Sequence, residues 1–92
     1  RGRWREPVTD EPRWTARYYK RAEVGTERWT SLIDAVRYLV VNEESGWLAP
    51  DAIISPDGVE LYRFGYQDGQ VRIEDLYERL CAEEIEKEVE EL

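Results

Sequence analysis

The chain has 92 residues, of which 41% are hydrophobic, and it carries a net charge of −8 at neutral pH. This length allows one domain with one core and excludes a second domain, while four tryptophans and six tyrosines supply enough apolar area to exclude a disordered chain. The acidic balance disfavours a nucleic-acid partner, because binding to phosphates depends largely on Lys and Arg.

The sequence has no apolar run of the roughly 18 to 20 residues that a membrane-spanning helix requires. The single cysteine, Cys81, excludes an internal disulfide and fits a reducing compartment, so a cytoplasmic location is expected. Residues 1–13 are predicted to form a poorly ordered N-terminal arm, and residues 14–92 a single α+β domain. Eleven arginines against two lysines are typical of a GC-rich coding sequence.

Alternation with a period of two predicts a strand at residues 14–21. Gly25 is predicted to turn the chain, and residues 26–30 to return as an antiparallel partner that ends near Trp29. Residues suited to the core occupy one face of the first strand: Trp14, Ala16 and Tyr18. The other face is expected to be an exposed basic patch that binds a partner: Arg17, Tyr19 and Arg21.

The strongest helix signal follows this hairpin. Ser31 is predicted to cap the helix, with Asp34 three residues later in an imperfect capping box. Gly46 is predicted to end the helix. A stripe with helical spacing is expected to face the core: Leu32, Val36, Leu39 and Val40.

A second pair of strands is predicted at residues 52–54 and 59–64, joined by the turn sequence Ser-Pro-Asp-Gly at residues 55–58. Pro50 is assigned to the connection before them, and residues 68–69 to a further reversal. The complete order is ββαββα. It predicts an α+β fold, with a four-stranded antiparallel sheet, two helices packed on one face of it, and a long, acidic C-terminal helix.

The last helix, predicted at residues 73–92, carries nine acidic residues against two basic ones. Its first apolar residues cluster on one side, which suits packing, but later ones drift around the helix because four residues overshoot a turn by about 40°. The end is therefore expected to overhang and to bind a partner through Ile85, Val89 and Leu92. The alternative is a helix end that lies over its own sheet.

Residues for catalysis are not found in the sequence. It has no histidine, one cysteine and no glycine-rich phosphate loop, so no catalytic, cofactor-binding or metal-binding residues are predicted. The protein is expected to be non-enzymatic. A cavity lined by converging carboxylates with shifted pKa values would reopen that question.

Two resemblances concern function. Residues 14–39, a Tyr-rich hairpin followed by a helix, resemble the arm-binding module of phage-type tyrosine recombinases, which implies DNA contacts by Arg17, Lys20 and Arg21; the acidic remainder of the chain departs from that family. As a short, Arg-rich, acidic chain, the protein is also similar to small accessory proteins of actinobacterial phages, many of which bind and disable a host protein.

The expected function is therefore that of a small protein-binding modulator or inhibitor of phage type. It would mask its target with the acidic C-terminal helix and the aromatic face of the hairpin. The expected partner is a protein with a basic or helical surface, or a second copy of the chain in a homodimer; membranes and nucleic acids are not expected. The alternatives are a DNA-binding accessory domain that uses the hairpin, and an inhibitor that mimics DNA.

Overall fold

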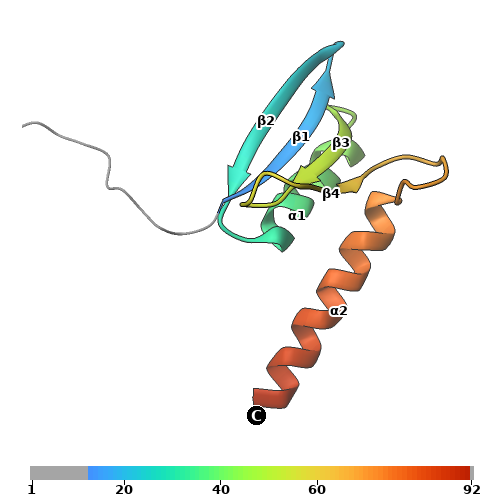
Figure 1. Cartoon of the computed structure of the whole chain (residues 1–92). Coiled ribbons are helices and arrows are strands. Elements are labelled where there is room, and N and C mark those ends of the chain that lie inside the picture. The colour runs from blue at the N-terminus through green and yellow to red at the C-terminus, as the bar shows by residue number, and fades with distance from the viewer. Residues whose placement is uncertain (1–12, 92) are drawn as a thin grey trace, which may run out of the picture.

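The computed structural model describes residues 13–91, with side chains described through residue 87. Apart from Arg13, the predicted N-terminal arm therefore lies outside the described residues. The predicted α+β fold with the order ββαββα is confirmed, and the strands form one antiparallel sheet in the order β2-β1-β3-β4 (Figure 1). The elements have these bounds: β1, Trp14–Lys20; β2, Glu23–Trp29; α1, Leu32–Glu44; β3, Ala49–Ile54; β4, Glu60–Arg63; α2, Ile73–Glu91.

The β1–β2 hairpin turns at Arg21 and Ala22, so the predicted turn at Gly25 is wrong. Both turn residues have positive φ angles, 53° and 67°, although neither is glycine. Gly25 lies inside β2, opposite Tyr18. A Cβ atom at Gly25 would lie only 2.6 Å from ring carbons of Tyr18, so this glycine makes room for the tyrosine ring.

The ends of α1 follow the local sequence signals. Ser31 caps the helix by accepting a hydrogen bond from the backbone N–H of Asp34 at 3.2 Å. The predicted capping box is therefore formed only on the side of Ser31, because the carboxylate of Asp34 is paired with Arg37 at 2.8 Å. Gly46, with φ of 78°, ends the helix in a Schellman motif, in which the N–H of Trp47 donates to the carbonyl of Asn42 at 2.9 Å.

The third strand contains a proline. β3 begins at Ala49, so Pro50 lies in the strand, and its predicted place in a connection is wrong. Arg17 pairs with Ala52 while Tyr18 pairs with Pro50, which leaves Asp51 as the extra residue of a β-bulge. Proline is tolerated at a bulge because the regular ladder is interrupted there.

The predicted turn at residues 55–58 is present between β3 and β4. The N–H of Gly58 donates to the carbonyl of Ser55 at 2.9 Å, and the N–H of Ser55 donates to the carbonyl of Val59 at 2.8 Å. Gly58 has φ of 87°, a conformation that glycine adopts without strain.

The core lies between α1 and one face of the sheet. Its most buried residues come from both layers: Ala16, Val36, Leu39 and Ile53. Trp14 and Trp29, which are paired across the hairpin, pack against this core, as predicted for Trp14. The ring of Tyr38 on α1 contacts Trp29, with ring centroids 5.5 Å apart, and thereby seals the edge of the core beneath β2.

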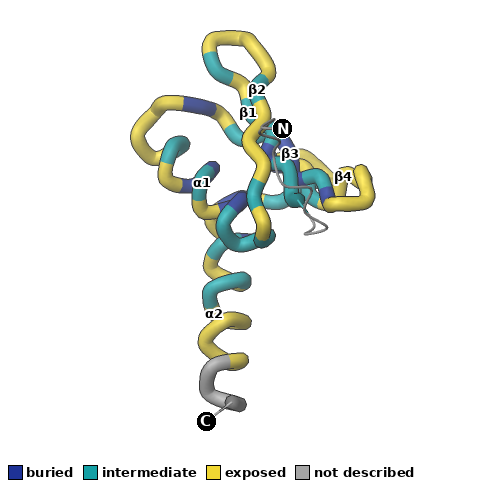
Figure 2. Tube along the Cα trace, turned by 90° about the vertical axis from the view of Figure 1, so that its left-hand side faces the viewer, coloured by how far each residue is buried: buried dark blue, intermediate teal, exposed yellow. Residues whose placement is uncertain are grey.

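The last helix, α2, belongs to the body only at its beginning. Ile73 and Leu76 are buried in the core, and Tyr77 and Leu80 pack against it. The helix packs mainly beside α1 and does not lie along the sheet. Beyond Leu80 it projects away from the body, where Figures 1 and 2 show a protruding helix with a largely exposed surface.

Candidate interaction surfaces

The sequence of α2 explains where the helix leaves the body. Its packed residues share one side: Ile73, Leu76, Tyr77 and Leu80. The next positions on that side, four and seven residues after Leu80, are Glu84 and Lys87, and both are exposed. Since charged side chains cannot continue an apolar contact with α1, the helix separates there. Residues 82–87 are all exposed, and we call them the projecting segment.

The projecting segment can stay helical without packing. It contains strong helix formers, and Glu83 precedes Lys87 by four residues, an arrangement that stabilises a helix by about 0.2–0.5 kcal/mol. Glu83 also lies four residues after Arg79, so the two opposite charges are neighbours on the helix surface. The segment is therefore a preformed helical surface with an excess of carboxylates.

The predicted binding residues of this helix fall partly outside the described side chains. Ile85 is 61% exposed, so the structure leaves it uncovered, as the prediction requires. The side chain of Val89 and all of Leu92 lie outside the described residues. Glu84 lies on the side of α2 that faces the body, and Ile85, as the next residue, points about 100° away from that side.

A crevice opens where α1 and α2 separate. The helices run antiparallel. Nε of Arg37, near the middle of α1, donates to the hydroxyl of Tyr77, in the second turn of α2, at 3.1 Å, and the first turn of α1 lies beside the third and fourth turns of α2. The crevice has a volume of about 410 Å³. Its lining combines apolar and charged residues: Ser31, Leu32, Ile33, Leu80, Glu83, Glu84, Glu86 and Lys87.

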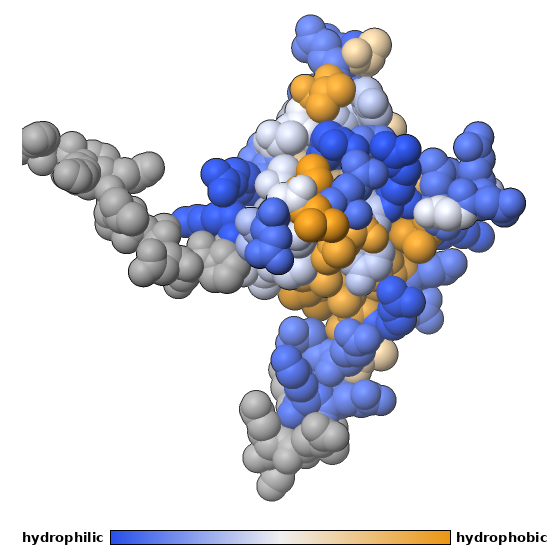
Figure 3. Space-filling view, in the orientation of Figure 1, coloured by the Kyte–Doolittle hydropathy of each residue, from blue (hydrophilic) through white to orange (hydrophobic). Residues whose placement is uncertain are grey.

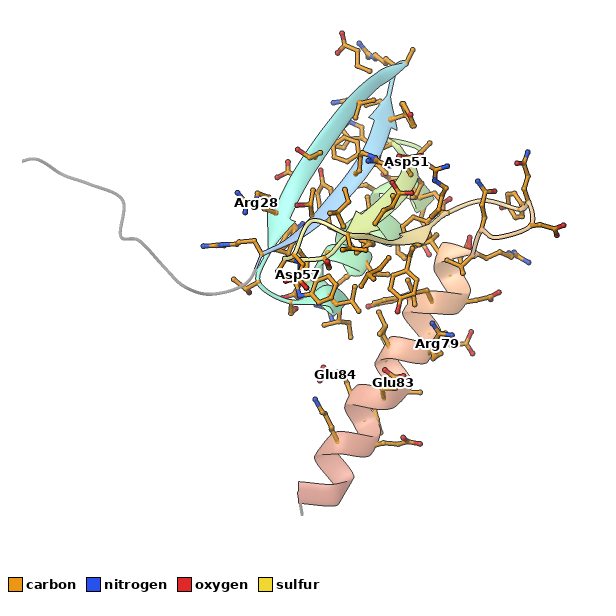
Figure 4. All side chains as sticks on the ribbon, in the orientation of Figure 1. Arg28, Asp51, Asp57, Arg79, Glu83 and Glu84 are labelled. Atoms are coloured by element: carbon orange, nitrogen blue, oxygen red, sulfur yellow. The ribbon has the colours of Figure 1, made fainter. Side chains whose placement is uncertain are left out.

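The surface views agree with this arrangement. In Figure 3, apolar surface gathers at the foot of the body, where α2 leaves it, whereas the visible side of the helix below is hydrophilic. Figure 4 labels Glu83 and Glu84 on the part of α2 that extends below the sheet. Apolar and acidic surfaces therefore adjoin at this end of the molecule.

The predicted basic patch on the hairpin is not formed as expected. Arg17 is not free, because its guanidinium donates to Asp51 at 2.5 Å and to Glu60 at 2.8 Å. Glu60 also pairs with Arg63 at 2.9 Å. The hydrogen bonds to the two carboxylates raise the pKa of Arg17, and the bond from Arg17 is the main cause of a lowered pKa at Glu60. Arg17 therefore ties strands together and does not join Tyr19 and Arg21 in an open patch.

A smaller basic and aromatic surface lies at the hairpin tip. Tyr19 is 44% exposed, and Arg21 is exposed in the turn. The ammonium group of Lys20 lies 3.6 Å from the ring centroid of Trp47, which is a cation–π contact. This contact could not be predicted from local patterns, because Trp47 follows α1 and reaches the tip only through the fold.

One recess brings acidic groups together. It has a volume of about 200 Å³, and its lining includes Glu43 and Glu74 from the two helices, together with Arg72. Burial raises the pKa of Glu43, and the nearby carboxylates of Glu74 and Glu44 raise it further. The recess is thus a cavity lined by neighbouring carboxylates, one of them with a raised pKa, which is the observation that reopens the question of catalysis. Antiparallel packing of the end of α1 on the start of α2 accounts for the shift.

Neither a membrane-spanning helix nor a metal-ion cluster is found in the described part of the chain. Among residues 13–91 no helix is long and apolar enough to cross a membrane. Within the same part of the chain, no group of three or more His, Cys, Asp or Glu residues is arranged to hold a metal ion. Comparisons with protein-family models, with curated proteins and with solved structures gave no match.

Proposed function

We propose that this protein is a small, non-enzymatic protein-binding modulator of the phage accessory type, which covers a basic surface on a host protein. One observation carries the proposal: α2 continues past Leu80 as an exposed, acidic helix that the core does not use. Residues 73–92 carry nine carboxylates and two basic groups, which gives this segment a net charge of −7.

The mechanism is occupancy. An acidic helix that protrudes from a small body can approach a basic groove on another protein and exclude whatever normally binds there. Long-range attraction between opposite charges accelerates such an encounter and favours basic surfaces over others. If the masked groove is a DNA site, the protein would act as a DNA mimic, which is a narrower form of the same function.

Affinity capture from the lysate of a GC-rich actinobacterium tests the proposal. The intact chain should retain a host protein with a basic surface, and the retained amount should fall steeply as salt is raised, because salt screens exposed charges. A variant with Glu83, Glu84 and Glu86 changed to Gln should lose this protein. A control variant with the same net charge keeps those residues and instead neutralises exposed acids elsewhere: Glu23, Asp57 and Asp68.

Truncation after Leu80 gives a second test. The shortened chain should keep its fold, because the described residues beyond Leu80 contribute no buried side chain to the core, and it should lose the captured protein. If the truncated chain and the variant with Glu83, Glu84 and Glu86 changed to Gln retain the same proteins as the intact chain, the role of α2 in binding is wrong.

DNA binding by the hairpin remains the second candidate, with less support. Arg21 is exposed at the tip and Lys20 contacts Trp47 there, but Arg17 is held by Asp51 and Glu60. A gel-shift experiment with duplex DNA at low salt tests it: a shift that is lost when Lys20 and Arg21 are changed to Ala would favour this candidate over protein binding.

A further inference from the structure

We propose that the crevice between α1 and α2 is a binding site for one amphipathic helix of the target, which carries Lys or Arg beside its apolar residues. The inference rests on the proposed function and names the site and the chemistry of the partner. It differs from the sequence prediction, which placed binding on Ile85 and its neighbours.

The apolar floor of the crevice is the first argument. Leu32 and Leu80 extend the core to its surface, and Ile33 lies beside them, half-buried. Ile33 is not among the residues that pack against the core, so its apolar surface is available to a partner. A helix that lies between α1 and α2 would bury these three side chains as a third helix against an antiparallel pair.

The charge of the rim is the second argument. Glu83, Glu84 and Glu86 line the crevice, opposed only by Lys87 among its lining residues. Basic side chains on either side of an apolar stripe would meet these carboxylates while the stripe covers the floor. Such pairing fixes orientation and speeds association, and the burial of apolar area supplies affinity.

The same charge argues against a second copy of the chain. Two α2 helices placed side by side would bring together two sets of nine carboxylates with only two basic groups each. Like charges facing one another destabilise an interface. The crevice therefore favours a basic partner, and self-association is an outcome that would count against the inference.

Titration with a defined peptide tests the site. The probe is a synthetic helical peptide of Leu and Lys, with Leu at positions i, i+3, i+4 and i+7; the comparison peptide has the same composition in scrambled order. The amphipathic peptide should bind at least about tenfold more tightly than the scrambled one, because only the first can cover the floor and reach the rim at once. NMR shifts of the bound protein should change most at Leu32, Ile33 and Leu80.

Matched variants separate the site from general effects. Ile33→Ser should weaken binding of the amphipathic peptide about five- to tenfold, whereas Val41→Ser, which changes an exposed residue of the same helix outside the crevice, should change it less than about twofold. Glu84→Lys should weaken binding by a similar factor, whereas Glu78→Lys, with the same change in net charge, should have little effect. Thermal unfolding of each variant checks that the fold is kept.

The outcomes distinguish the inference from the proposed function. Equal binding of the two peptides, or equal losses from Ile33→Ser and Val41→Ser, would overturn the crevice while leaving salt-sensitive capture by α2 intact. Dimer formation that depends on Ile33, seen by sedimentation in the absence of peptide, would also overturn it. Failure of the actinobacterial capture, in contrast, would count against the proposed function itself.

Discussion

The guanidinium of Arg17 on β1 is joined to the carboxylate of Asp51, the extra residue in the bulge of β3. The pair is partly shielded, with side-chain exposures of 26% and 20%. Because the same guanidinium also reaches Glu60 on β4, one side chain links three strands of the sheet. The ion pairs thus hold the bulged strand in register with its neighbours.

Replacing Arg17 with Ala is expected to lower the free energy of unfolding by about 1–2 kcal/mol, because Asp51 loses its partner at a half-buried position. Urea unfolding followed by circular dichroism measures the loss. Arg28→Ala removes an exposed cation from the neighbouring strand and should change stability by less than about 0.5 kcal/mol. Equal effects of the two substitutions would show that the pairs of Arg17 contribute nothing specific.

The same site gives stability a dependence on acid pH. Arg17 lowers the pKa of Glu60 in the folded chain, so this carboxylate stabilises the fold above its unfolded pKa, and the contribution is lost as the pH falls through the folded pKa. In the Arg17→Ala variant, this part of the acid dependence should become smaller; Arg63, which also lowers the pKa of Glu60, keeps the remainder. Thermal unfolding of both proteins across a series of acidic buffers checks it, and parallel curves would contradict it.

The turn at Arg21 and Ala22 is a site for stabilisation. Both residues have positive φ angles, which cost L-residues about 1–2 kcal/mol each, whereas Asn-Gly suits a two-residue turn of this hand. Changing the pair to Asn-Gly should stabilise the protein by about 1 kcal/mol and raise its melting temperature by about 4–8 °C. Ala22→Gly alone should give part of the gain; an unchanged or lower melting temperature would show that the turn is not under strain.

Gly25 is predicted to be intolerant of a side chain. Gly25→Ala should cost about 1–3 kcal/mol, because the new methyl group would collide with the ring of Tyr18. If that collision is the cause, the loss should be smaller in a Tyr18→Ala background, as a double-mutant cycle measures. Additive losses would place the cause elsewhere in β2.

Tyr38 should make the fold sensitive to alkali. Burial, and next its interaction with the Tyr18 hydroxyl, raise its pKa to about 12 in the folded chain. The neutral phenol therefore stabilises the fold fully below the ordinary tyrosine pKa of about 10, and the contribution is lost as the pH rises through the folded pKa. Tyr38→Phe should remove that part of the alkaline destabilisation, measured by thermal unfolding from neutral to alkaline pH. A variant that loses stability with alkali as steeply as the parent would contradict the assignment.

Elements with local signals could be predicted from the sequence. Ser31 and Gly46 bound α1, and the turn at residues 55–58 forms as expected, because in each case neighbouring residues supply both the conformation and the hydrogen bonds. The hairpin turn could not be found in this way. Gly25 looks like a turn residue but serves packing against Tyr18, while Arg21 and Ala22 carry no turn signature.

The interaction surfaces needed more than local patterns. Helical spacing predicted that Ile85 would be exposed, and it is. The pairing of Arg17 depends on strand register and on a bulge at Asp51, and the crevice depends on α1 and α2 being antiparallel. Both are long-range relationships, which the spacing of residues along one segment does not contain.

The boundary at Leu80 also has a consequence for evolution. A mutation in most positions of a domain this small risks unfolding it, but substitutions in residues 82–87 alter surface alone. Descendants of this gene can therefore exchange charges and contacts there at little cost to folding, while the scaffold beneath stays the same.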